Sequence, residues 1–187
     1  MPDIPTAARE LLAALVGKRI VAVRRHPEGE RREPTLADDG VRGPIELELD
    51  DGTRIHATAD PERRSVLLEA GPLAPAPALE ASRDAFWRWR LRRPVAGIVV
   101  WKSLDVPERA PELEFGVEVA LAGTRGFVVE LVDEDGLVTL AVTDGSRPER
   151  HRDLRIAGTG SAALPERPGR ARQGRERTTG GWRRRAR

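Results

Sequence analysis

The sequence contains no cysteine, no tyrosine and no asparagine, and only one methionine. A chain without cysteine has no disulfide framework, no zinc site built on thiolates and no cysteine nucleophile. It also lacks an apolar run near the roughly 20 residues that a membrane span requires, and no signal-peptide pattern opens it. These absences predict a soluble, cytoplasmic protein.

Lysine is scarce as well, because Lys18 and Lys102 are the only two among 32 basic residues. The other basic residues are arginines, and alanine, glycine and proline are plentiful, which is the composition that a GC-rich genome produces. Part of the arginine content therefore reflects codon usage and does not by itself indicate nucleic-acid binding. With 187 residues, of which 39% are apolar, the chain can form one compact domain or two small ones.

Charge is distributed unevenly along the chain. Residues 157–187 contain nine arginines and two glutamates, a net charge of +7, whereas residues 1–156 carry a net charge of −5. The terminal segment has no Val, Ile or Phe, so it cannot bury enough apolar surface to fold and is predicted to be disordered. One interpretation is a basic arm for weak, non-specific nucleic-acid binding, with Arg183, Arg184 and Arg185 as candidate contacts. The other, which we favour, is a solvated extension without such a role.

Alternation of apolar and polar residues predicts most of the body to be β-structure. The predicted fold class is α+β, mainly antiparallel β, with two similar β-hairpin-based halves that are each preceded by a short helix. The helices are expected over 6–16 and 79–86, and a charged stretch over 24–43 is expected to be a long surface loop. The expected segments are a first β-rich half over 1–72, a linker with a short helix and a Trp/Arg segment over 73–92, a second β-rich half over 93–156, and the disordered basic tail over 157–187.

The clearest local signal is a hairpin around the sequence Asp-Asp-Gly at 50–52. A three-residue loop puts apolar side chains on one face of the hairpin and opposite charges on the other, whereas a two-residue loop mixes the faces. Gly52 then occupies the position where such a loop requires a left-handed residue. The pairs that this register opposes are Ile45 with Ala57, Leu47 with Ile55, Glu46 with His56, and Glu48 with Arg54.

The two halves resemble each other in the order of their predicted elements. Each has a short apolar strand, a charged loop, an alternating strand and two further strands, and the tripeptide Gly-Thr-Arg occurs at 52–54 and again at 123–125. We interpret this pattern as an internal duplication with a repeat near 70 residues. Coincidence is the alternative, since hairpins share their patterning. The predicted strands are 20–23, 45–49, 54–58, 66–68, 95–101, 113–121, 127–131 and 137–142.

The strings LVGKRIVAVRR and GPIELELDDGTRIHATAD resemble segments of small uncharacterised β-rich bacterial proteins from GC-rich organisms. Some proteins of this group are immunity-protein-like, which implies binding and neutralising a partner toxin. The resemblance covers about residues 1–145 and leaves the tail unmatched. It carries over no catalytic residues, since none are defined for that group.

Combinations of residues typical of catalysis or metal binding are missing. The three histidines, His26, His56 and His151, have no metal-ligand spacing, and the five serines include no nucleophile elbow. His56 is most simply the cross-strand partner of Glu46. We therefore expect no catalytic residues, no metal site, no cofactor and no enzymatic activity.

One segment combines aromatic and basic residues, because Trp87 and Trp89 alternate with Arg88, Arg90 and Arg92. In an extended conformation, this alternation places an aromatic face opposite a basic face, as suits stacking on bases and contact with phosphates. These five residues are therefore candidates for binding a polyanion. The alternative, which we favour, is that both tryptophans pack in the core while the arginines pair with carboxylates on the surface.

Three functional hypotheses follow. The first is a non-enzymatic soluble binding module, immunity-like, that meets a protein partner through an acidic surface and the charged loops over 24–43 and 102–112. The alternative is a nucleic-acid-associated protein that uses the arginine-rich tail and the Trp/Arg segment. The third is an enzyme whose site leaves no sequence pattern. The sequence determines neither the partner nor the oligomeric state.

Overall fold

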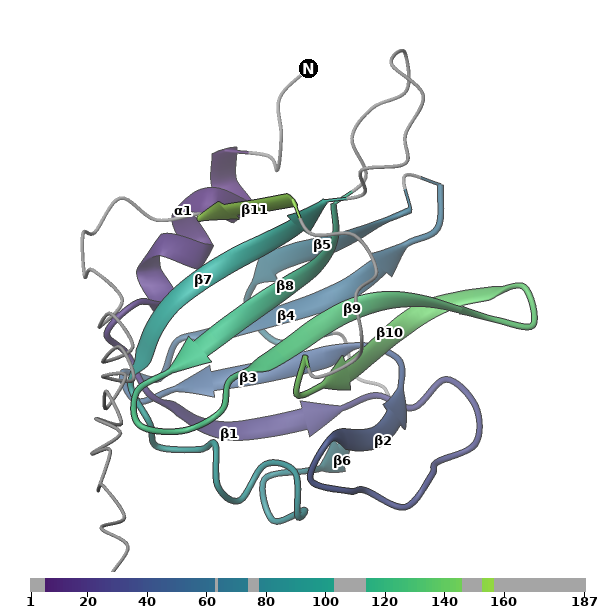
Figure 1. Ribbon diagram of the computed structural model, residues 1–187, viewed down its shortest axis with the longest axis horizontal. Helices are drawn as coiled ribbons and strands as arrows, with labels where there is room; N and C mark the ends of the chain where they lie inside the picture. The colour runs from purple at the N-terminus through teal and green to yellow at the C-terminus, as the bar shows by residue number, and fades with distance from the viewer. Residues whose placement is uncertain (1–5, 63, 74–77, 103–113, 146–152, 157–187) are drawn as a thin grey trace, which may run out of the picture.

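The computed structural model of the protein describes residues 6–62, 64–73, 78–102, 114–145 and 153–156. Two antiparallel sheets lie face to face, and one helix lies at one side of the pair (Figure 1). No helix in these described ranges is long and apolar enough to cross a membrane. The elements are α1 (Thr6–Leu15), β1 (Ile20–Arg25), β2 (Asp38–Arg42), β3 (Ile45–Leu49), β4 (Arg54–Asp60), β5 (Ser65–Ala70), β6 (Leu79–Glu80), β7 (Val95–Lys102), β8 (Glu114–Leu121), β9 (Phe127–Glu134), β10 (Leu137–Thr143) and β11 (Asp153–Ile156).

The first sheet has the strand order β5-β4-β3-β1-β6, and the second has the order β11-β7-β8-β9-β10-β2. The predicted mainly antiparallel β class is therefore confirmed. Period-two alternation gives each sheet one apolar face, and these two faces form the core between the layers. The helix α1 contributes Leu12 and Leu15 to the same core and contacts β5 and β7.

The predicted hairpin is confirmed, with its three-residue loop. Strands β3 and β4 pair in the expected register, and the Leu49 N–H donates to the Thr53 carbonyl at 2.9 Å to close the loop. Gly52 has φ +82°, in the left-handed region. The Lys18 ammonium forms an ion pair with Asp51 at 2.5 Å, and the pKa of Asp51 is lowered to about 2, chiefly by this contact.

Gly52→Val should lower the free energy of unfolding by more than about 1 kcal/mol, because a β-branched residue resists the left-handed backbone. A Cβ atom at this position meets no heavy atom within 4 Å, so the cost arises from the backbone and not from a clash. Urea unfolding measures it. Gly52→Asn is the control, since asparagine tolerates this conformation, and an equal loss in both variants would contradict the backbone explanation.

The expected helix over 79–86 is wrong, and α1 is the only helix in the described part of the chain. Leu79 and Glu80 instead form β6, which pairs with Arg25 and Arg24 at the edge of the first sheet. The next residues continue this attachment, because the Ala81 N–H donates to the Val23 carbonyl and the Val23 N–H donates to the Ser82 hydroxyl. Pairing with β1 therefore overrides the local preference for a helix.

The expected surface loop over 24–43 is also wrong in its second half. Residues 38–42 form β2, which lies beside β10 at the edge of the second sheet, and this strand is mostly buried. This stretch has almost no apolar residues, and a buried ion pair between Arg25 and Asp39 holds it in place instead. Most of the predicted loop over 102–112 and the whole tail over 157–187 fall outside the described residues.

Candidate binding surface

A buried ion pair connects β1 to β2. Arg25 and Asp39 are both 0% exposed, and Arg25 Nε lies 2.9 Å from Asp39 Oδ2. The two Nη atoms of Arg25 donate to the carbonyls of Gly43, Val41 and Leu140, at 2.7, 2.6 and 3.4 Å. Burial raises the pKa of Asp39, and the Arg25 charge opposes that shift. This pair therefore secures the crossing of the chain from one sheet to the other.

Trp87 extends this network into the aromatic part of the core. Its indole N–H donates to Asp39 Oδ2 at 3.3 Å, and its ring makes edge-on contacts with Phe86 and Phe127 at centroid distances of 5.0 and 4.9 Å. The Trp87 side chain is fully buried. The structure therefore places this candidate residue in the interior, where no polyanion contacts it.

Arg90 is buried too, although it belongs to the same sequence segment. Its guanidinium donates to the carbonyls of Phe86, Gly126 and Leu36 at 2.5, 3.0 and 3.2 Å, and it stacks 3.8 Å above the Phe86 ring. Burial lowers its pKa. Arg90 thus binds three backbone segments together and is not available to an external ligand.

The segment over 85–92 is a run of turns and not an extended strand. The hydrogen bond from the Arg88 N–H to the Asp84 carbonyl, at 3.0 Å, is one of the contacts that coil it. Trp87 and Trp89 consequently do not share a face, since Trp87 is buried and Trp89 is 58% exposed. Both sequence interpretations of the pair are therefore wrong in part: one tryptophan packs in the core and the other faces solvent.

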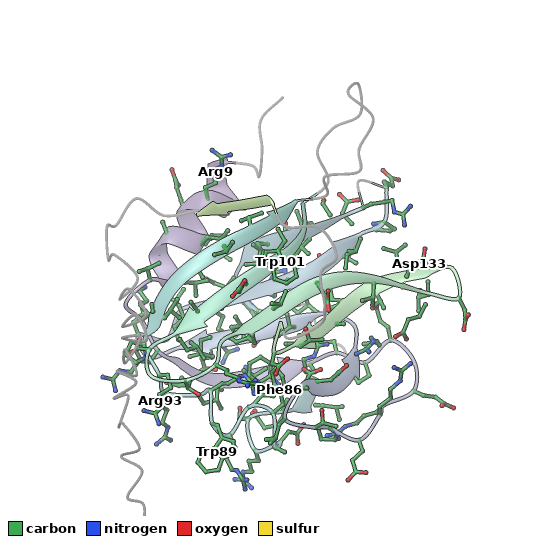
Figure 2. The ribbon with its side chains drawn as sticks, viewed as in Figure 1. Arg9, Phe86, Trp89, Arg93, Trp101 and Asp133 are labelled. Carbon is green, nitrogen blue, oxygen red and sulfur yellow. The ribbon has the colours of Figure 1, made fainter. Side chains whose placement is uncertain are left out.

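Trp89 projects from the edge of the molecule, while Phe86 lies nearer the sheets (Figure 2). Among the described residues, only Leu36 and Leu137 are comparable as large exposed apolar side chains, at 65% and 51%. Leu36 precedes β2, and its carbonyl is held by Arg90, the neighbour of Trp89 in sequence. Arg31 and Asp84 form an ion pair at 3.0 Å that joins the same two segments. We call the surface formed by Arg88 and Trp89 the Trp89 surface.

An open depression of about 470 Å³ lies next to Trp89. Three arginines, Arg83, Arg88 and Arg92, surround it together with Val21, Ser82 and Leu91. The sequence pattern indicated Arg88 and Arg92 but not Arg83, because only the coiled conformation of the segment brings Arg83 into the same lining. Arg93 is exposed but does not line the depression. Arg183, Arg184 and Arg185 lie outside the described residues.

The histidines form no metal centre in the described part of the chain, where no three His, Cys, Asp or Glu side chains are grouped to hold a metal ion. His56 stands opposite Glu46 as predicted, but its ring bonds the Gly71 carbonyl at 3.0 Å and Glu69 at 3.2 Å. Glu46 instead accepts from Arg24 at 2.6 Å and from the Leu73 N–H at 3.0 Å. This cluster is a cross-strand charge network on the outer face of the first sheet.

Comparison with protein-family models, with curated proteins and with solved structures gives no match for this chain.

Proposed function

We propose that this protein is a non-enzymatic binding module that engages a protein partner through the Trp89 surface. The observation that carries this proposal is the position of Trp89, an indole left 58% exposed on a segment that is anchored in the core by Phe86, Trp87 and Arg90. Covering such an indole in an interface is worth roughly 2–3 kcal/mol. Tryptophan and arginine are the residue types that most often dominate protein interfaces.

The surface is also preorganised. Arg90 holds Leu36 and the coiled segment together, and the Arg31–Asp84 ion pair joins them a second time. A rigid surface loses little conformational entropy when it binds. Arg88, whose guanidinium lies 5.1 Å from the Trp89 ring centre, adds positive charge, so the partner surface should be acidic. This proposal moves the interface from the acidic surface that the sequence suggested to an arginine-bearing one.

A protein partner fits better than a nucleic acid. A nucleic acid would require several stacking platforms or a continuous basic groove. In the described residues only Trp89 among the aromatics is a large exposed hydrophobic side chain, and residues 1–156 carry a net negative charge. Nucleic-acid binding remains the second candidate because Arg88 stacks beside the exposed indole. If the resemblance to immunity-like proteins holds, the protein partner is a toxin that this chain neutralises.

Trp89→Ala should raise the Kd for the partner by at least about tenfold, because it removes the apolar anchor of the interface. A photoreactive phenylalanine analogue placed at position 89 of the full chain in bacterial cells captures the partner for identification. Calorimetric titration with the purified partner then measures Kd. Leu137→Ala is the matched control, since Leu137 is similarly exposed, at 51%, but lies at the β9–β10 turn.

An equal effect of Trp89→Ala and Leu137→Ala would contradict the assignment of the surface. Crosslinks that form to nucleic acid and not to protein would support the second candidate and reject the first. A captured protein whose affinity does not depend on Trp89 would also reject it.

We also infer that the two β-rich halves are related by duplication. The order β5-β4-β3-β1 in one sheet corresponds to the order β10-β9-β8-β7 in the other. The register shifts between Ile20 and Ala22 in β1, and between Val95 and Gly97 in β7, at equivalent positions of the two meanders. In addition, Arg19 and Pro94, which directly precede these two strands, form a bridge with each other, as residues on a pseudo-twofold axis would. These coincident irregularities favour a duplication over a chance resemblance of hairpins.

A further inference from the structure

We propose that the depression beside Trp89 is a binding site for a phosphate monoester that carries an apolar or aromatic group. Its volume of about 470 Å³ falls in the range that small-molecule sites occupy. Among the described residues, three arginines and no carboxylate line it, while Val21 and Leu91 add apolar surface. This site adjoins the proposed protein interface and shares Arg88 with it, but Trp89 does not line it.

The carboxylates near the depression are already engaged. Asp84 pairs with Arg31 at 3.0 Å, on the side of the preceding loop. The Ser82 hydroxyl donates a hydrogen bond to Glu80 Oε1, and Glu80 Oε2 lies 3.9 Å from Arg24 Nε. Consequently Arg83, Arg88 and Arg92 have no ion-pair partner among the described residues. All three arginines are exposed and line the same depression, so their positive charge favours an anion bound there.

The number of arginines points to phosphate and not to carboxylate. One guanidinium already matches both oxygens of a carboxylate, so three exceed what a single carboxylate can use. A phosphate monoester carries about −1.5 to −2 charge near neutral pH and offers three acceptor oxygens. Val21 and Leu91 would then contact the organic part of the molecule, which distinguishes an ester from inorganic phosphate.

The backbone at Arg92 supports a functional role for its side chain. Arg92 has φ +61°, a left-handed conformation that is strained for a residue other than glycine, and its N–H donates to the Ile20 carbonyl at 2.8 Å. Strained backbone conformations are concentrated at ligand sites, where binding by the side chain offsets the conformational energy that the backbone costs. Glycine would suit this backbone better, so an arginine at this position costs stability.

Calorimetric titration of the full chain at low salt tests the site, with adenosine 5′-monophosphate, inorganic phosphate and adenosine as probes. We expect the monophosphate to bind more tightly than inorganic phosphate, and adenosine not to bind. Arg92→Gly should weaken monophosphate binding by about tenfold or more while leaving Tm unchanged or higher, because it removes a charged donor and relieves the backbone. Arg93→Gln, the adjacent exposed arginine outside the depression, should change binding less than twofold.

Three results would overturn the proposal: no monophosphate binding at millimolar concentration, an equal loss in Arg92→Gly and Arg93→Gln, or displacement of the monophosphate by citrate at the same concentration. The last result would indicate a general attraction of anions. Failure here leaves the protein-partner proposal intact, because that proposal depends on Trp89, which does not line the depression.

Discussion

Replacing Asp39 with alanine should lower the free energy of unfolding by about 3–5 kcal/mol, one of the two largest effects expected for a single substitution in this protein. The variant leaves the fully buried Arg25 guanidinium without its counter-charge. It also removes the acceptor for the Val41 N–H and for the Trp87 indole N–H. Chemical denaturation followed by circular dichroism measures the change.

Two further variants separate charge from hydrogen bonding. Asp39→Asn keeps an acceptor oxygen but removes the charge, so it should still lose most of the stability if the ion pair dominates. Arg125→Ala breaks an ion pair of similar length, 3.2 Å to Asp144, in which the arginine is 79% exposed, and it should cost less than about 1 kcal/mol. Equal losses in Asp39→Ala and Arg125→Ala would refute the importance of burial.

Trp87→Ala should destabilise the protein by about 3–5 kcal/mol, whereas Trp89→Ala should change its stability by less than about 0.5 kcal/mol. Trp87 is fully buried between Phe86 and Phe127, so its removal leaves a cavity that the two sheets cannot close. Trp89 is largely exposed and contributes little to the core. Urea unfolding of the two variants, two residues apart in sequence, provides the comparison.

Trp87→Phe serves as the intermediate case, because it keeps aromatic packing but loses the hydrogen bond to Asp39. Its stability should lie between those of the wild type and of Trp87→Ala. Similar stabilities for Trp87→Ala and Trp89→Ala would show that the two side chains are equivalent. The division between a structural and a surface tryptophan would then be wrong.

The candidate binding surface was only partly predictable from the sequence. The pattern of Trp and Arg over 87–92 pointed to this segment as a candidate, because basic residues interleaved with aromatic ones suit binding to a polyanion. It could not assign roles, because alternation in the sequence divides faces only when the chain is extended, and here the segment is coiled into turns. Two of the candidate side chains, Trp87 and Arg90, are buried in the structure and stabilise the fold. Arg83, which the sequence pattern did not include, lines the depression with Arg88 and Arg92.

The sequence by itself determined the hairpin over 45–57 down to the register of its pairs, because a pleated strand allows only one loop length that separates apolar from charged residues. It likewise predicted the strands of both meanders, where period-two alternation is a local property. Only the tertiary structure decided that β2 joins the second sheet and that residues 79–80 form a strand. Both depend on partners distant in the chain: Arg25 pairs with Asp39 in the interior, and the edge of β1 supplies the hydrogen bonds of β6. Such long-range pairing overrides local propensity, because an unpaired buried charge or unpaired backbone groups at a strand edge cost more free energy than a change of local conformation.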